Sequence, residues 1–520
     1  MGEGRLYNVR LVRGVMPASG IKSMYSRRSF IECMAAFTAG RVFAAPPGMF
    51  AGGNPRLAFA AISDIHVCHP KTGRNLGTEV FERALEWYRR QGIDAVLVAG
   101  DLAEHGLVDE LEMIGEAWRR MFPDGKAPDG RHVEKVFVTG NHDYVAWAYG
   151  DFAKKLYPDE AELERHKLAA HYAETWAAAF GEKYEPIYMK DIRGYKFIGS
   201  HWTGEEGEEG GEEWFGERLS GFLAAHGDGL GGEKPFFYVQ HPHPKGTVFR
   251  ASGAVADDGR TAEILSSWPN AIAFSGHSHR SITDERSIWQ DGFTSVNIGC
   301  LRRTNFFATR NVPKDRGYEN WKTPKVYRDA AARALNRAKA MPLYGPHWDC
   351  HQGTLVRVFE DRVVIERREM GTGEPVAPDW VIPLPVAASR RPYDYDRREA
   401  DSIAPQFAED AKLSVEVVSA ANRGGETVPA VKLSFPAANA EGGARPFDYR
   451  VEVVDANGRS TVRAVLAEGA DYGIRSKYAQ GPSSCVLALD SLPQGPLVFK
   501  VYPGECFGKL GRPISARFDA

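Results

Sequence analysis

The stretch Gly140-Asn141-His142-Asp143 follows the apolar run Val136-Phe137-Val138, which has the composition of a buried strand. A polar tetrapeptide directly after such a strand predicts a loop at the carboxyl end of a sheet, where α/β proteins hold their ligands. An Asn beside a His is by itself more often a simple turn. A functional role for this stretch is favoured because similar arrangements recur elsewhere in the chain.

Four other apolar runs also end in Asp or His. They are residues 58–62 before Asp64-Ile65-His66, 95–98 before Gly100-Asp101, 236–239 before His241, and 271–274 before Gly276-His277-Ser278-His279. A single buried His is usually a core residue, but five strand-loop units of this kind favour a metal site. Imidazole, carboxylate and amide groups bind borderline divalent metals. One carboxylate shared by two sets of ligands is typical of a two-metal centre.

The bulk properties limit the class of protein. A chain of 520 residues with 43% hydrophobic and 26% charged residues is typical of a globular protein of two domains, with a third not excluded. A net charge of -3 gives no electrostatic reason to expect a nucleic-acid partner. No apolar run reaches the roughly 18 residues needed to span a membrane.

Residues 1–45 are interpreted as an N-terminal extension with an export signal. Ser26-Arg27-Arg28-Ser29-Phe30-Ile31 has a twin-arginine pattern, and Val42-Phe43-Ala44 offers small residues before a cleavage point. The expected location is the periplasm or the exterior. The alternative is an ordinary basic tail, and Met24 is an alternative start to Met1. In an oxidising compartment Cys485 and Cys506 could form a disulfide, which the sequence alone does not decide.

Residues 55–386 alternate strand-like and helix-like patterns and predict an α/β domain, a β-sheet core layered by helices. Helices are predicted at Glu79–Arg90, at Val108–Met121, and over 152–180 with a break near Pro158. Segment 204–232 is rich in Glu and Gly, and its acidic run Glu205–Glu213 is interpreted as a solvated loop rather than a cation site. Residues 302–345 are interpreted as an insertion over the site, with a helix at 329–341. Residues 353–367 predict a hairpin.

The C-terminal part changes character. Residues 387–405 are charged, contain Pro and predict a linker. Residues 406–520 carry short alternating runs separated by turn-forming residues, which predicts a small all-β sandwich similar to immunoglobulin or fibronectin type III modules. No catalytic cluster is found in it, so contact with a glycan or a protein is the role left open for it.

The five motifs together resemble the calcineurin-like metallophosphoesterase superfamily. They are Asp64-x-His66, Gly100-Asp101, Gly140-Asn141-His142-Asp143, the lone His241 and Gly276-His277-x-His279, in this order along the chain. The resemblance covers roughly residues 56–367 and implies a layered β-sheet core flanked by helices. It says little about the substrate.

The resemblance also implies a ligand set for two divalent or trivalent transition metal ions, Mn, Fe or Zn. Asp64, His66 and His279 would bind one ion, Asn141, His241 and His277 would bind the other, and Asp101 would bridge them. A hydroxide held between the ions would attack the phosphorus atom, since metal binding brings the pKa of water towards neutrality.

His142 has a different role in this resemblance. Family members place the His after the Asn against the leaving-group oxygen, as general acid or hydrogen-bond donor. An acidic residue three positions after the bridging Asp orients it; here this is Glu104, whose carboxylate is expected to raise the pKa of His142. His105 stands where protein phosphatases carry an Arg, which disfavours phosphoprotein substrates. His105 and Tyr144 are predicted to contact the substrate.

A purple di-iron centre is disfavoured, because such enzymes carry a Tyr ligand at the position of Glu104 and begin with Asp-x-Gly. The combination of Asp-x-His and Gly-His-x-His is closer to hydrolases of cyclic nucleotides and glycerophosphodiesters. The predicted function is therefore hydrolysis of a small phosphodiester or phosphomonoester outside the cytoplasm. Two alternatives are a nuclease, and a cell-surface glycan- or protein-binding protein with a vestigial phosphoesterase scaffold.

Overall fold

The computed structural model describes residues 53–519, except for 73–76, 204–212, 250, 252–255, 306–345, 348–349, 387–390, 422–426, 440–445 and 467–481. The predicted export signal and the predicted helix at 329–341 lie outside the described residues. Among the residues described, no helix combines the length and the apolar character needed to cross a membrane. Cys485 and Cys506 are both buried, and no disulfide joins them to each other.

The first sheet carries three of the five motif loops. Strands β1 (Leu57–Ile62), β2 (Ala95–Ala99) and β3 (Glu134–Val138) run parallel to one another. On the other side of β1 the sheet continues with antiparallel strands, giving the order β14-β13-β12-β1-β2-β3. The added strands are β12 (Gln352–Val358), β13 (Arg362–Glu369) and β14 (Pro375–Pro383).

The second sheet carries the other two motif loops and has the order β4-β5-β6-β7-β9-β8. Its strands β5, β6, β7 and β9 are parallel. The bounds are β4 Ile187–Ile192, β5 Tyr195–Ser200, β6 Phe236–Val239, β7 Ala271–Ser275, β8 Ile288–Gln290 and β9 Thr294–Asn297.

The alternation of side chains along β1 shows how the two sheets pack. Phe59 and Ala61 belong to a buried cluster shared with the second sheet, whereas Ala60 and Ile62 belong to a cluster shared with helices. The Phe59 ring meets Phe197 at 5.1 Å and Phe237 at 4.8 Å between ring centroids. Both faces of the strand are thus covered, which explains why β1 is a continuous apolar run.

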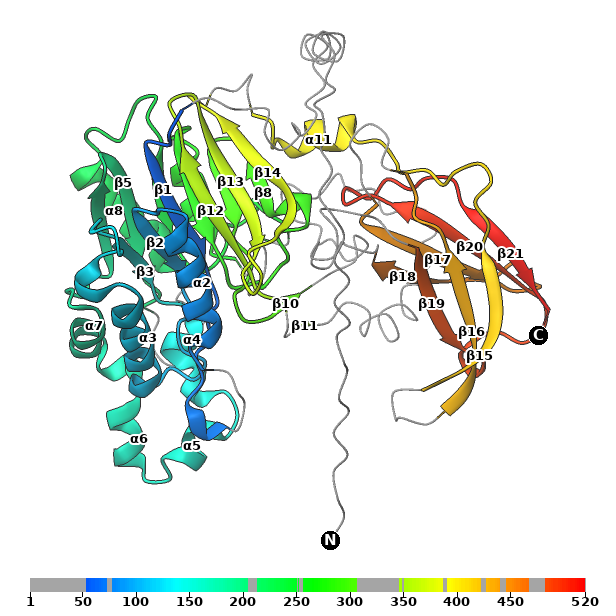
Figure 1. Ribbon diagram of the computed structural model, residues 1–520, viewed down its shortest axis with the longest axis horizontal. Helices are drawn as coiled ribbons and strands as arrows, with labels where there is room; N and C mark the ends of the chain where they lie inside the picture. Colours follow the sequence, from blue (N-terminus) through cyan, green and yellow to red (C-terminus); the bar gives the residue numbers. More distant parts are fainter. Residues whose placement is uncertain are drawn as a thin grey trace, which may run out of the picture. The chain divides into compact units, whose positions relative to one another are not determined.

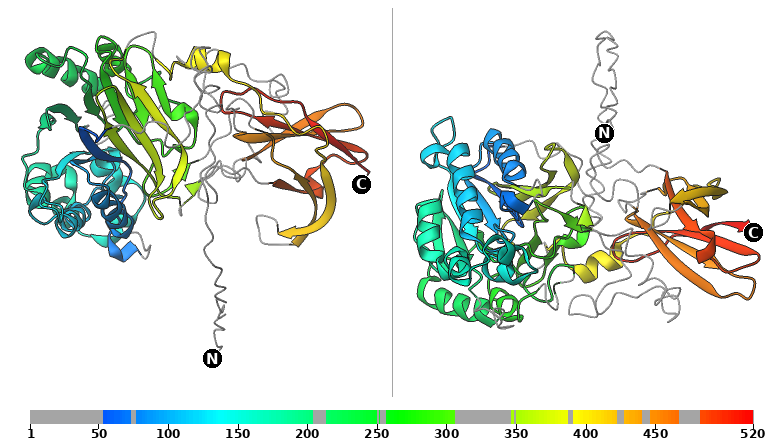
Figure 2. Two further views of the ribbon diagram at one scale, coloured as in Figure 1. Left: turned by 45° about the horizontal axis from the view of Figure 1, so that its top comes forward. Right: turned by 90° about the horizontal axis from the view of Figure 1, so that it is seen from below.

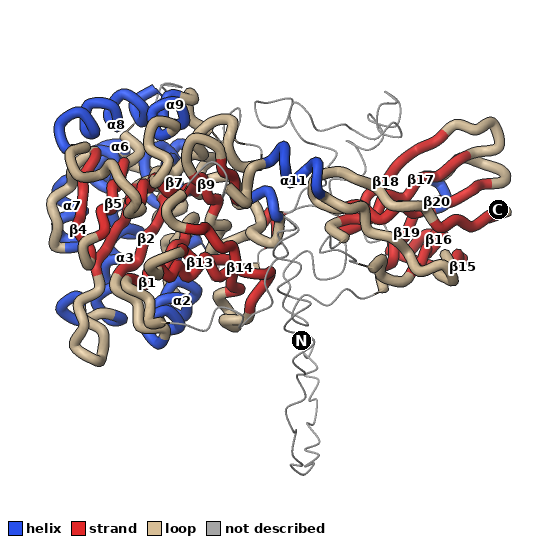
Figure 3. The backbone as a smooth tube through the Cα atoms, turned by 90° about the horizontal axis from the view of Figure 1, so that it is seen from above, coloured by secondary structure: helices blue, strands red, loops and turns tan. Residues whose placement is uncertain are grey.

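Helices cover the outer face of each sheet. Residues of α2 (Glu79–Arg90), α3 (Val108–Met121) and α7 (Tyr172–Phe180) pack on the first sheet, and residues of α8 (Glu213–His226) and α9 (Arg260–Leu265) pack on the second. Figure 1 shows α2 and α3 beside β1, β2 and β3, and Figure 3 shows strands between the two sets of helices. The predicted layered α/β core is confirmed.

The predicted helices at Glu79–Arg90 and Val108–Met121 have the observed bounds. The segment 152–180 is divided more often than predicted, into α5 (Phe152–Leu156), α6 (Glu160–His166) and α7. The acidic run predicted as a loop lies outside the described residues except for its last residue, Glu213, where α8 begins. Phe215, Leu219 and Leu223 recur at helical spacing and are buried, a signal hidden by the Gly and Glu around them.

The C-terminal strands form two antiparallel sheets, as a sandwich requires, with orders β15-β16-β19 and β18-β17-β20-β21. Their bounds are β15 Ser414–Ala421, β16 Thr427–Phe435, β17 Asp448–Val454, β18 Ser460–Leu466, β19 Ser483–Ala488, β20 Leu497–Gly504 and β21 Ile514–Phe518. Figure 2 gives two further views of these strands. The predicted linker contains a short helix, α11 (Tyr395–Asp401).

Candidate metal centre

The predicted metal ligands lie on loops that follow parallel strands of both sheets. They gather in two groups whose ligand atoms lie within 4.8 Å of one another: Asp64, His66, Asp101 and His279, and Asp101, His241 and His277. Asn141, the first residue of the short helix α4 (Asn141–Val145), joins the second group through a 3.1 Å contact between its Oδ1 and His241 Nε2. All seven predicted ligands therefore take part in one constellation, in which Asp101 belongs to both groups.

Main-chain hydrogen bonds join the loops after β1 and β2. The Asp64 N–H donates to the Gly100 carbonyl at 3.0 Å, and the His66 N–H donates to the Asp101 carbonyl at 3.0 Å. These bonds continue the pairing of the two strands beyond their ends. The first two motifs are thereby held side by side by hydrogen bonds between their main chains.

The buried carboxylate of Asp143, the last residue of the Gly-Asn-His-Asp motif, joins the loop after β3 to the loop after β2. It accepts N–H groups from Gly140 at 2.7 Å, Ala103 at 2.7 Å and Leu102 at 3.2 Å. Burial, with Asp101 nearby, raises the pKa of Asp143 to about 7. This Asp therefore has a structural role, which sequence reasoning did not assign.

The backbone of the ligand loops is strained. Seven non-glycine residues in the described part of the chain have positive φ, and five of them are Asp64, His66, Asp101, His277 and His279. Each such residue costs of order 1–3 kcal/mol, and strain of this kind persists where the surrounding structure imposes it, most often at functional sites. The left-handed conformations thus coincide with the residues predicted to bind metal.

In the second group, three acceptor atoms face one another. The His241 Nδ1 lies 2.7 Å from the Ala99 carbonyl oxygen, so Nδ1 carries the hydrogen and donates it. The Nε2 atom of the neutral ring then has a lone pair, and it lies 3.2 Å from Asp101 Oδ2 and 3.1 Å from Asn141 Oδ1. Three such atoms require a cation between them, either a proton or a metal ion.

The first group repeats this arrangement. The His66 Nδ1 lies 2.7 Å from the Glu104 carboxylate, which directs Nε2 towards the other ligands. That Nε2 lies 3.1 Å from His279 Nε2 and 3.6 Å from Asp101 Oδ2, and His279 Nε2 lies 2.9 Å from Asp64 Oδ1. The same oxygen of Asp101 thus faces both groups, which is the geometry of a bridging ligand.

Two further observations fit a metal centre. Asp64 Oδ1 and Asp101 Oδ2 are buried, and within the described residues neither accepts a hydrogen bond of adequate geometry. Burial alone would lower the pKa of His66 and His241. The carboxylates outweigh it: Asp64 and Glu104 raise the pKa of His66 to about 10, and Asp101 raises that of His241 to about 9. The cluster therefore attracts positive charge, and its imidazole and carboxylate ligands suit a transition metal.

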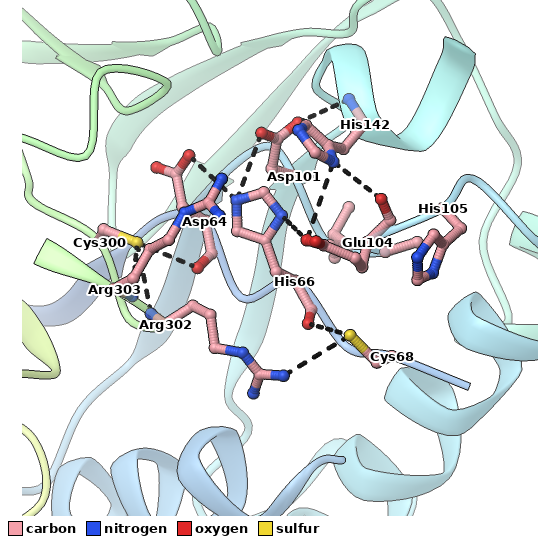
Figure 4. Close-up of polar contacts among 12 residues, drawn as sticks. Asp64, His66, Cys68, Asp101, Glu104, His105, His142, Cys300, Arg302 and Arg303 are labelled. Carbon is pink, nitrogen blue, oxygen red and sulfur yellow. Dashed lines mark hydrogen bonds and ion pairs between the residues drawn. The ribbon is translucent and has the colours of Figure 1, made fainter. Parts of the chain in front are cut away.

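Glu104 and His142 lie together, but not as predicted. The His142 Nδ1 donates to the main-chain carbonyl of Glu104 at 2.8 Å, whereas the Glu104 carboxylate lies 3.8 Å from His142 and 2.7 Å from His66. Figure 4 shows Glu104 between the two rings. The main chain of Glu104 thus orients His142, and its carboxylate orients His66. Burial lowers the pKa of His142, contrary to the expected increase.

The two predicted substrate contacts are both engaged within the protein. The His105 Nδ1 lies 2.8 Å from the buried Glu110 carboxylate, and its ring packs on Phe152. Tyr144 stacks on Tyr172, with 5.9 Å between ring centroids, and packs against the core beneath the first sheet. These contacts assign both residues to packing, and their contact with substrate stays a prediction.

Two buried histidines close to the motifs are not part of the ligand groups. The His201 Nδ1 accepts the Thr139 N–H at 3.1 Å, and burial lowers the pKa of His201 to about 3. The two ring nitrogens of His243 each lie 2.7 Å from a hydroxyl, those of Ser275 and Ser278, and burial lowers its pKa to about 3. Both are neutral core residues that support the loops.

Three side chains beside the cluster lie outside the predicted ligand set. The Arg303 Nε donates to His279 Nδ1 at 3.0 Å. Trp202 lies against His241 and His277, and Tyr149 lies against His142. Arg303 and Trp202 stand near motif loops in the sequence, whereas no sequence signal marks Tyr149. The contacts of all three with the cluster depend on the way distant loops meet.

Comparison with protein families agrees with this geometry. Residues 57–281 match the family model described as calcineurin-like phosphoesterase. This segment is a calcineurin-like phosphoesterase domain. The family suggests hydrolysis of a phosphoester, and the residue groups around Asp101 suggest the metal centre that such chemistry uses.

Solved structures similar to the chain include a dimetal phosphatase from Danio rerio (12% identity, TM-score 0.34, covering 64% of this chain and 99% of that one). Another is the purple acid phosphatase PPD1 of yellow lupin seeds (13% identity, TM-score 0.37, covering 64% of this chain and 55% of that one). A third is GAP50 of Plasmodium (10% identity, TM-score 0.34, covering 64% of this chain and 89% of that one). At these identities and TM-scores they carry no information on the substrate of the phosphoesterase domain. No curated protein matches the sequence.

Gly140 is required because three loops meet around it. A Cβ atom there would lie 2.3 Å from Asp101 Oδ1 and 2.7 Å from the His241 ring. We expect Gly140→Ala to displace Asp101 and to lower both bound metal and stability, the latter by about 1–3 kcal/mol. Gly221→Ala, in α8 with open space around it, is the control and should change neither adversely. Metal analysis and urea unfolding of both variants test this. Wild-type metal content and wild-type stability in Gly140→Ala would contradict the prediction.

Proposed function

We propose that the phosphoesterase domain hydrolyses a small phosphoester, with diesters favoured over monoesters, at a centre of two transition metal ions. The observation that carries the proposal is the position of Asp101 Oδ2, which lies 3.6 Å from His66 Nε2 and 3.2 Å from His241 Nε2. One carboxylate oxygen shared by two ligand groups is what a pair of adjacent ions needs.

The ligand roles follow the two groups. Asp64, His66 and His279 would hold one ion, Asn141, His241 and His277 would hold the other, and Asp101 would contact both. Bound ions would lower the pKa of water towards neutrality and stabilise negative charge on the phosphate oxygens. Glu104 supports this ligand set, because its carboxylate contacts Nδ1 of His66, the ring nitrogen that would not face the ions.

We assign to His142 the role of assisting departure of the leaving group. Its main-chain N–H donates to Asp101 Oδ1 at 2.9 Å, and its Nδ1 donates to the Glu104 carbonyl at 2.8 Å. The residue is therefore fixed at two points beside the Asp101 carboxylate, by its main chain and by its ring. Its Nε2 is left as the nitrogen that can exchange a proton or hydrogen-bond with a leaving oxygen.

The preference for diesters rests on the resemblance of the Asp-x-His and Gly-His-x-His motifs to hydrolases of cyclic nucleotides and glycerophosphodiesters. The net charge of -3 supplies no surface for tracking a nucleic-acid backbone, which supports a small substrate.

We further propose export by the twin-arginine route, which transports folded proteins and would suit a centre assembled around metal inside the cell. The support is Arg27-Arg28 and the small residues ending at Ala44. Replacing both arginines by lysine should leave the precursor in the cytoplasm, as cell fractionation would show. Normal export of that variant, or a mature protein beginning before Arg27, would contradict the proposal.

Asp101→Asn is the direct test of the proposed function. An amide bridges two cations poorly, so we expect lower metal content and a large loss of turnover on a panel of phosphodiesters and phosphomonoesters. Asp94→Asn is the matched control: Asp94 is also a buried carboxylate on the first sheet, where it accepts the Ala58 N–H away from the cluster. Two equivalents of metal and normal turnover in Asp101→Asn would overturn the assignment.

His142→Asn separates catalysis from metal binding. The variant should keep its metal and lose roughly 10²–10⁴-fold in turnover of esters with alkoxide leaving groups. Esters of nitrophenol should suffer less, because nitrophenolate departs without protonation. Glu104→Gln should behave differently and weaken metal binding by about 10–100-fold, since its carboxylate supports His66. Equal losses on both ester types together with loss of metal from His142→Asn would make His142 a structural residue.

A further inference from the structure

Tyr149 is an exposed aromatic side chain beside the residue proposed to meet the leaving group. It follows the short helix η3 (Ala146–Ala148), and its ring stands edge-on to His142 with 5.4 Å between centroids. Its side chain is 48% exposed, and it is one of four exposed large hydrophobic residues in the described part of the chain. One exposed ring is ordinary on a protein surface, but its contact with His142 gives it a function to consider.

Trp202 is a partly buried aromatic side chain beside the other ligand group. Its ring lies 6.2 Å from the His277 ring and 6.4 Å from the His241 ring, and it packs against Phe215 at 5.9 Å. Its main chain is held at both ends by Thr139: the Trp202 N–H donates to the Thr139 carbonyl, and the Trp202 carbonyl accepts the Thr139 hydroxyl. The main chain that carries the ring is thus held by two hydrogen bonds, and the ring itself packs on Phe215.

The two rings belong to different halves of the metal centre. Tyr149 contacts His142, whose ring lies 4.6 Å from that of His66 in the first ligand group. Trp202 contacts His241 and His277, which belong to the second group with Asp101. Asp101 is common to both groups, and the phosphate would be bound by the two ions that Asp101 contacts.

We propose that Tyr149 and Trp202 are specificity-determining residues that contact the two organic groups of a phosphodiester. This inference rests on the proposed function. Tyr149 contacts the leaving group, because it adjoins His142, and Trp202 contacts the group that stays on the phosphate. An indole face favours a planar aromatic partner, so the retained group is one that carries an aromatic ring, such as a nucleoside. A monoester has no group for Trp202 to contact.

Three chromogenic substrates with one leaving group test the role of Trp202. They are thymidine 5′-(4-nitrophenyl phosphate), methyl 4-nitrophenyl phosphate and 4-nitrophenyl phosphate, which retain a nucleoside, a methyl group and no organic group. Wild-type kcat/KM should be higher for the thymidine ester than for the methyl ester, by roughly 10-fold for one stacked base. Trp202→Leu should remove this advantage, while turnover of the other two substrates and metal content stay near wild type.

Tyr149→Leu is the matched variant. Since all three substrates share the leaving group, it should lower the three kcat/KM values by one common factor and leave their ratios unchanged. Trp202→Phe keeps an aromatic face and should retain part of the thymidine preference, which also covers the case in which Trp202→Leu fails to fold.

Two results would overturn the inference. One is a wild-type enzyme that hydrolyses these esters without preferring the thymidine diester; the other is a preference that survives in Trp202→Leu. Equal loss on all three substrates in Trp202→Leu would make the ring a structural support of the histidines, which also contradicts the proposal. Failure of the wild-type protein on every substrate would instead overturn the proposed function on which this inference rests.

Discussion

The arrangement of the catalytic domain depends on the position of one buried carboxylate. Asp101 Oδ1 accepts the His142 N–H, while Oδ2 faces the Nε2 atoms of His66 and His241. Asp101 itself lies in a left-handed conformation. Its Oδ1 atom and the His241 ring lie so close to Gly140 that a Cβ atom has no room there. The two sheets, by placing the ends of their parallel strands at one edge, create a site where such a carboxylate can be shared.

This arrangement is costly without a cation. Acceptor atoms face one another at Asp101, and five of the predicted ligands have a strained backbone. The nearby carboxyl group of Asp143 is buried, and its pKa is raised. Protons on His66 and His241 would offset this repulsion, and the surrounding carboxylates raise the pKa of both imidazoles. Metal ions would replace these protons, so metal binding and the stability of this edge of the domain are thermodynamically coupled.

The sequence predicted those parts that have a local signal. Helical spacing of apolar residues was enough to predict α2 and α3. The polar residues after apolar strands were enough to single out the side chains that gather around Asp101. Contacts made by distant loops left no such signal: the Glu104 carboxylate lies on His66 because the loops after β1 and β2 are paired by backbone. Tyr144 stands two residues after His142 in the sequence and stacks on Tyr172, whereas Tyr149 is exposed beside His142.

The most direct test is a crystal structure of the metal-loaded protein, with the ions located by anomalous scattering at their absorption edges. The account predicts two ions about 3.5–4 Å apart with an Asp101 oxygen between them, one ion contacted by His66 and the other by His241. A single ion, or two ions without Asp101 between them, would contradict it.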